Sequence, residues 1–190
     1  MLFTKSLAIL ASAAMVSAYN TVTFVSQDHL DRVVTFTNNR DHPWLPSIGV
    51  PAGQNVTYTF PYGWTGNWFA NMKGAPIIPG MLGEVCFNSW GGLSYFDVSA
   101  IVDPNDHVGV KKIWPKGNPD NNSGCDIFPC NNVYINPDDV QTKADPAVDY
   151  ICTLGTGYTH PSPRSVDVDA SIFARDSVQG KWLSRHARQT

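Results

Sequence analysis

Short alternations of apolar and polar residues recur along the chain and are separated by turn-forming residues. The clearest spans residues 55–60, where Val, Tyr and Phe alternate with Asn and Thr, the period of a half-buried strand. We interpret residues 27–31 as a hairpin turn between the first two strands. Many short strands, with no helical period before residue 165, predict an all-β sandwich or barrel. Strands are predicted over residues 21–26, 32–37, 55–60, 84–87, 93–102, 110–114, 133–135 and 150–154.

The two ends of the chain differ from this body. Lys5, the apolar residues 7–16 and the small residues at 16–18 form the pattern of a signal peptide that is removed before Tyr19. The apolar stretch is too short to span a bilayer, so we predict secretion without a membrane span. Residues 164–190 carry five basic and three acidic side chains. The predicted division is a signal peptide (1–18), a β domain (19–163) and a basic tail (164–190) that is helical or disordered.

Four cysteines follow the signal peptide, and an even number in a secreted chain indicates two disulfides. Three pairings are possible. We favour a short bridge between Cys125 and Cys130 and a long bridge between Cys86 and Cys152. A zinc site is the competing interpretation, but the spacing matches no zinc finger or ribbon, so we predict no metal.

The surface chemistry of the body agrees with an extracellular or cell-wall location. Asn55 and Asn121 each begin an N-glycosylation tripeptide. Residues 19–163 carry seven basic and thirteen acidic side chains. Because phosphate binding needs a basic surface, this balance argues against nucleic acid as a partner.

Carboxylates are the first candidate catalytic groups. Glu84 is the only glutamate in the chain, and Asp97 follows thirteen residues later on a second predicted strand. Two carboxylates flanking a glycosidic bond are what sugar hydrolysis requires. The competing interpretation is that an Asp in a strand-rich protein caps a turn. The sequences at 103–107 and 136–139 are turn-forming first, and either could bind calcium, although neither matches an EF-hand loop.

Aromatic residues are the second candidate. Residues 62–69, which include Trp64 and Trp68, are dense in rings, and Trp44, Trp90, Tyr95, Phe96 and Trp114 add more. Exposed rings beside Asn and Gly suit stacking on sugars. The alternative is that most of these rings form the core, because aromatic side chains dominate all-β interiors.

Residues 80–85 and 92–99 resemble the central segment of thaumatin-like proteins, in which a Glu-bearing strand precedes a Tyr-Asp-Val-Ser strand. With residues 138–141 and 151–155, the chain is similar over roughly 20–157 to the small secreted fungal thaumatin-like proteins of the CetA/CalA type. The resemblance implies a thaumatin-like β-sandwich with an acidic cleft. The cleft acids map onto Glu84, Asp97 and Asp103, and the candidates for a cleft arginine are Arg32 and Arg40.

The same resemblance implies a role in cell-wall integrity or conidial germination. We expect β-glucan binding in the acidic cleft, with Asp103, Tyr95, Trp64 and Trp68 as substrate-binding residues and no cofactor. One alternative is a weak endo-β-1,3-glucanase that uses Glu84 as general acid and Asp97 as its partner. Another is an adhesin or effector that binds a host surface protein, which predicts an exposed apolar patch away from the cleft.

Overall fold

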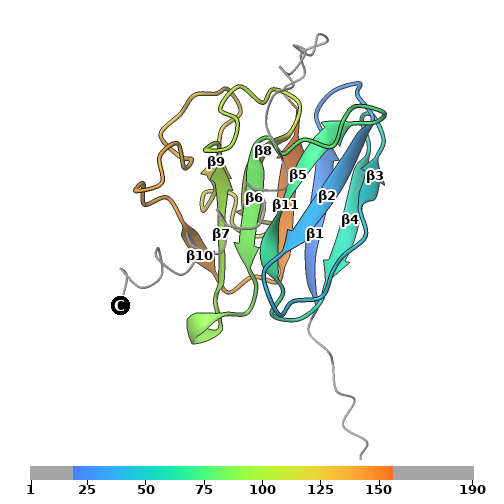
Figure 1. The fold of residues 1–190 in the computed structure, drawn as a ribbon. Coiled ribbons are helices and arrows are strands. Elements are labelled where there is room, and N and C mark those ends of the chain that lie inside the picture. Colours follow the sequence, from blue (N-terminus) through green and yellow to red (C-terminus); the bar gives the residue numbers. More distant parts are fainter. Residues whose placement is uncertain (1–18, 156–190) are drawn as a thin grey trace, which may run out of the picture.

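Two β-sheets face each other and enclose a shared core (Figure 1). The computed structural model describes residues 19–155. The predicted signal peptide (1–18) and basic tail (164–190) lie outside the described residues. The five-stranded sheet has the order β4-β1-β11-β8-β9, and the six-stranded sheet has the order β10-β7-β6-β5-β2-β3. The prediction of an all-β, sandwich-like fold is confirmed.

The strands are short and are joined mainly by irregular loops. The five-stranded sheet contains β1 (Asn20–Ser26), β4 (Asn55–Phe60), β8 (Val110–Pro115), β9 (Ser123–Gly124) and β11 (Asp149–Leu154). The six-stranded sheet contains β2 (Arg32–Asn38), β3 (Ile48–Val50), β5 (Thr65–Met72), β6 (Leu82–Cys86), β7 (Ser94–Ser99) and β10 (Lys143–Asp145). A single 3-10 turn, η1 (Trp90–Gly92), lies between β6 and β7. Within residues 19–155, no helix is long and apolar enough to cross a membrane.

The first two strands belong to different sheets, so the predicted hairpin over residues 27–31 is wrong. β1 pairs with β4 and, in parallel, with β11, whereas β2 pairs with β3 and β5. Phe24 of β1 and Phe36 of β2 meet across the interior, with ring centroids 6.1 Å apart. Alternation identifies the buried face of a strand but not its neighbour in a sheet, which is why the sequence pattern misplaced the connection.

Strand β5 was not predicted from the sequence, because apolar and polar residues do not alternate along it. Its residues from Thr65 to Asn71 are all buried, as happens where both faces of a strand are covered. Residues 133–135 were predicted to form a strand, but Tyr134 forms only an isolated bridge with Ser99. A short apolar run predicts burial there, and Tyr134 is indeed buried.

The aromatic residues at the start of β5 form the centre of the core. Trp64 and Trp68 have no exposed surface. The Trp68 ring meets Phe24 edge-on at 5.5 Å, and Phe60 lies 5.7 Å from Trp68. Gly83 makes room for this indole, because a Cβ there would lie 2.5 Å from the Trp68 Nε1 atom. Close ring packing of this kind stabilises the interior.

One of the two predicted disulfides is present. Cys125 and Cys130 are bonded, whereas Cys86 and Cys152 are free thiols, so the long bridge is wrong. Cys152 points into the core between the sheets, where its sulfur accepts a hydrogen bond from the Trp68 indole at 3.4 Å. Cys86 packs against the cluster on the outer side of the six-stranded sheet. The two sulfurs therefore lie on opposite sides of the six-stranded sheet.

We expect the double variant Cys125→Ser/Cys130→Ser to lose about 2 kcal/mol of unfolding free energy. The bridge closes a short loop, so it removes less entropy from the unfolded chain than a long bridge would. Urea denaturation followed by circular dichroism measures the change. Cys86→Ser serves as the control because it removes a thiol without opening a bridge. An unchanged midpoint in the double variant would contradict the expectation.

Candidate functional site

The two predicted catalytic carboxylates lie side by side on neighbouring strands. Glu84 of β6 pairs directly with Asp97 of β7 in the antiparallel register, so both side chains lie on one face. That face is the outer one, because the adjacent Val85 belongs to the core between the sheets. Asn67 of β5 is opposite Glu84 on its other side. We call Asn67, Glu84 and Asp97 the polar row.

The polar row is closed to solvent. Glu84 is 2% exposed and Asp97 is 0% exposed. The Thr142 hydroxyl donates to Asp97 Oδ2 at 3.1 Å, and the Tyr134 hydroxyl lies 2.8 Å from Thr142 Oγ1. A polysaccharide cannot reach carboxylates that are buried in this way. The row is flanked by a small apolar cluster of Phe69, Leu82 and Tyr95.

Asp103 lies apart from the polar row, in the loop after β7. Its Oδ1 accepts the backbone N–H of Asn105 at 2.9 Å, which is the geometry of a residue that closes a turn. Asp139 does the same in the second turn sequence, where its Oδ2 accepts the N–H groups of Ile135 and Asn136. Among the described residues, no three His, Cys, Asp or Glu side chains are grouped to hold a metal ion.

The predicted sugar-stacking residues offer no ring to a ligand. Trp64 and Trp68 are buried in the core, and Tyr95 is 8% exposed. The Tyr95 hydroxyl donates to the Trp90 carbonyl at 3.3 Å. The alternative reading of these rings as core residues accounts for their positions.

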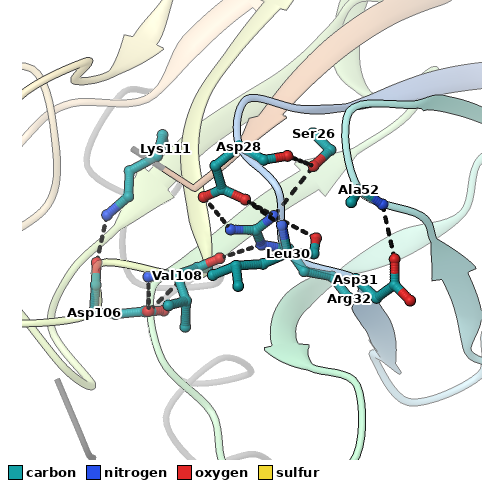
Figure 2. Close-up of polar contacts among 10 residues, drawn as sticks. Ser26, Asp28, Leu30, Asp31, Arg32, Ala52, Asp106, Val108 and Lys111 are labelled. Carbon is teal, nitrogen blue, oxygen red and sulfur yellow. Dashed lines mark hydrogen bonds and ion pairs between the residues drawn. The ribbon is translucent and has the colours of Figure 1, made fainter. Parts of the chain in front are cut away.

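Arg32, a candidate for a cleft arginine, instead forms a buried ion pair with Asp28 (Figure 2). Its Nη1 and Nη2 donate to the two Asp28 carboxylate oxygens at 2.7 and 2.6 Å, and its Nε donates to the Val108 carbonyl at 2.6 Å. Nη1 also donates to Ser26 Oγ and the Leu30 carbonyl. This planar fork of donors joins the loop after β1 to the loop before β8. The other candidate, Arg40, lies exposed in the loop after β2.

A second buried charge cluster lies beside this pair (Figure 2). Asp106 Oδ1 accepts the N–H groups of Val108 and Gly109 at 3.0 and 2.8 Å, and Oδ2 accepts the N–H of Met81 at 2.8 Å. The Lys111 ammonium donates to the Asp106 carbonyl. Asp106 and Lys111 are 2% and 1% exposed. This cluster was not predicted from the sequence, in which Lys112 follows Lys111 directly and nothing distinguishes the buried lysine from the more exposed one.

The two free thiols, Cys86 and Cys152, differ in burial. Burial raises the pKa of the Cys152 thiol to about 12, whereas Cys86 is only partly buried. Thiolates react with disulfide reagents and thiols do not. We therefore expect 5,5′-dithiobis(2-nitrobenzoate) at pH 8 to label one thiol per native molecule, and two thiols in urea.

Cys86→Ser is the matched variant for this assay and should leave no reactive thiol in the native protein. Labelling of two thiols without denaturant would contradict the burial of Cys152. Labelling of none in denaturant would mean that the long bridge forms after all.

Four exposed aromatic residues belong to segments that lie at one end of the sandwich, where the start of β1 and the η1 turn are found at the bottom of Figure 1. Strands β2, β4 and β6 finish at this end, and β1, β5 and β7 begin there. The rings come from four separate segments of the chain, and their exposed fractions are 56% to 77%. We call this group the aromatic end; its members are Tyr19, Trp44, Tyr62 and Trp90.

Hydrogen bonds tie the segments of the aromatic end to one another. The Trp64 indole donates to the carbonyl of Pro43, the residue before Trp44, at 3.1 Å. The Phe87 N–H donates to the Trp64 carbonyl at 3.1 Å. The amide of Asn20 donates to Asn88 Oδ1 at 2.7 Å, which joins the start of β1 to the loop that carries Trp90. The backbone around the four rings is therefore fixed by the fold.

Comparison with known proteins shows an extensive sequence match to an antigenic protein. The chain is 49% identical over 138 residues to the antigenic protein SchS21 of Stachybotrys chartarum, a match that covers 73% of this chain and 96% of the relative. The crystal structure of the protein elicitor MoHrip2 from Magnaporthe oryzae aligns with a TM-score of 0.48 at 16% identity, over 71% of this chain and 98% of that chain. No protein-family model matches.

The match to SchS21 overturns the resemblance to thaumatin-like proteins. That resemblance was proposed over roughly residues 20–157, but its most specific part was residues 80–85 and 92–99, which include the adjacent strands β6 and β7. A short pair of neighbouring strands carries little information about family, whereas the SchS21 match extends over nearly the whole relative. The expected thaumatin-like role in β-glucan binding is therefore wrong, and neither this match nor the burial of Glu84 and Asp97 supports the alternative glucanase activity.

Proposed function

This chain belongs to the family of the antigenic protein SchS21, and on that premise we propose that it is a secreted antigenic protein whose folded surface other proteins recognise. The observation that carries the proposal is 49% identity over 96% of that antigen. At this identity two chains share a fold. A host surface protein or an antibody is the kind of partner that the proposal implies.

Several features support a protein that works outside the cell. Residues 1–18 have the pattern of a signal peptide, and the Cys125–Cys130 bridge suits an oxidising compartment. The burial of Glu84 and Asp97 favours surface recognition over chemistry on a polysaccharide.

An antiserum raised against SchS21 tests the proposal. The protein is purified from the medium of a secreting fungal host, and N-terminal sequencing is expected to begin at Tyr19. The antiserum is expected to bind the folded protein in a native immunoassay more strongly than the reduced and carboxymethylated chain. Retention of the protein inside the host, or recognition of the unfolded chain alone, would contradict the proposal.

The two glycosylation tripeptides differ in the folded protein. Asn55 is exposed at the start of the edge strand β4. The Asn121 side-chain nitrogen donates to the Ala144 carbonyl at 3.0 Å and to Asp145 Oδ2 at 3.1 Å. A glycan on that nitrogen would displace at least one of these bonds, so we expect Asn55 to be occupied and Asn121 to be free.

Peptide mass spectrometry after enzymatic deglycosylation in heavy-oxygen water reads the two sites separately. Asn55→Gln should remove the glycan from the secreted protein, and Asn121→Gln should leave its mass shift unchanged. Equal occupancy of both sites would contradict the expectation.

A further inference from the structure

We propose that the aromatic end docks the protein on a neutral lipid surface, with the rings of Trp44, Tyr62 and Trp90 entering the headgroup region. This inference goes beyond recognition by antibodies and does not depend on it. It rests on the exposure of the rings, on the way their backbone is held, and on the charges around them.

The exposure of the rings is unusual for side chains of this size. Trp90 is 77% exposed, Trp44 is 72% exposed and Tyr62 is 64% exposed. Each lies in a connection between strands, on the η1 turn, the β2–β3 loop and the β4–β5 turn respectively. Large apolar side chains gathered on one surface mark a binding site. Because these rings lie on turns at the end of the sandwich, they can insert into the headgroup region of a lipid layer.

The fold holds these turns in place before any binding takes place. The contact from Trp64 to Pro43 and the contact from Phe87 to Trp64 link all three turns. The aromatic end therefore loses little backbone entropy when it docks, and prior ordering of a binding surface favours affinity. Tyr19 adds a fourth ring next to the linked Asn20.

The chemistry of the rings favours a lipid headgroup region. Trp and Tyr have an apolar body and a polar tip, and they concentrate where hydrocarbon meets water. Residues 61–64 and 88–93 contain no charged side chain, so these two turns carry no charge into the layer.

The surrounding charges select a neutral lipid. Arg40, Asp41, Lys116 and Asp120 lie on the connections at this end, and Asp145 and Asp149 lie where β10 ends and β11 begins, which gives two basic and four acidic side chains. Attraction to anionic lipids needs a basic patch, and this set does not supply one. A zwitterionic lipid such as phosphatidylcholine therefore fits the aromatic end better than an anionic lipid.

Co-sedimentation with pure phosphatidylcholine vesicles tests the inference. The protein is the secreted form beginning at Tyr19, because the apolar residues 7–16 would bind lipid by themselves. Neutral vesicles also remove electrostatic attraction from residues 164–190, which carry a net positive charge. We expect the wild-type protein to sediment with the vesicles. We expect the double variant Trp44→Ala/Trp90→Ala to bind the vesicles at least about tenfold more weakly.

Ile127→Ala is the matched control. Ile127 is 77% exposed, as Trp90 is, but it follows β9, which runs away from the aromatic end. This variant should bind vesicles as the wild type does. Thermal unfolding of all three proteins verifies that each is folded. No sedimentation of the wild type, or equal binding by the double variant, would overturn the inference and leave the aromatic end to a protein partner.

Discussion

Arg32→Met is expected to lower the free energy of unfolding by about 3 to 5 kcal/mol, because it leaves the Asp28 carboxylate buried without its cation. The Arg32 side chain is fully buried and its Asp28 partner is 5% exposed. Removing the guanidinium also leaves the carbonyls of Val108 and Leu30 without a donor. Urea denaturation of the variant measures the loss.

Lys112→Met is the matched control for this prediction. The ion pair of Lys112 with Asp126 lies at the surface, where the two side chains are 22% and 67% exposed. Exposed pairs contribute little, so this variant should change stability by less than about 1 kcal/mol. If the two variants lost equal stability, the assignment of Arg32 as a buried structural clamp would be wrong. The double variant Arg32→Met/Asp28→Asn should recover part of the loss, because it removes the stranded charge.

Trp68→Ala is expected to cost about 3 to 5 kcal/mol, as the loss of a buried aromatic ring does elsewhere. Its indole touches Phe24, Phe36 and Phe60, and it donates to the Cys152 sulfur. Alanine would leave a cavity between the two sheets. The midpoint of chemical unfolding measures the effect.

Trp90→Ala removes the same atoms from the surface and is the control for Trp68→Ala. Because the Trp90 side chain is 77% exposed, its loss should change stability by no more than about 0.5 kcal/mol. Equal costs for the two tryptophans would contradict the distinction between the core and the aromatic end. A neutral Trp90→Ala also shows that a loss of vesicle binding does not come from unfolding.

The sequence located the alternating strands most accurately, and it missed β5 and β3. Strands β1, β2 and β4 follow period-2 patterns and were located within one residue of their observed bounds. Strand β5 is buried on both faces, and β3 has only three residues. Neither carries a pattern of sufficient length. Neighbour relations between strands depend on contacts that are distant in sequence, which is why the assignment of β1 and β2 to one hairpin failed.

The candidate site shows the same limit at the level of side chains. Period 2 and spacing bring Glu84 and Asp97 to one face, and the structure places them opposite each other. Spacing does not reveal what covers that face, so it could not indicate that both carboxylates are buried. Conversely, Trp44 and Trp90 lie in connections without any periodic pattern. Only the pairing of the strands places these two connections at the same end of the sandwich.

The parallel pairing of β1 with β11 bears on the order in which this protein can assemble. Thr21 is opposite Asp149 and Ser26 is opposite Leu154, so the first strand of the described chain completes its sheet with the last. Strand β4 ends at Phe60 and β11 begins at Asp149, so during synthesis β1 has only β4 beside it in the sheet until 89 further residues (149 − 60) have emerged. Contacts this distant in sequence close slowly. A chain that ends before residue 149 lacks the central strand of its five-stranded sheet, so the final fold must wait until β11 has emerged.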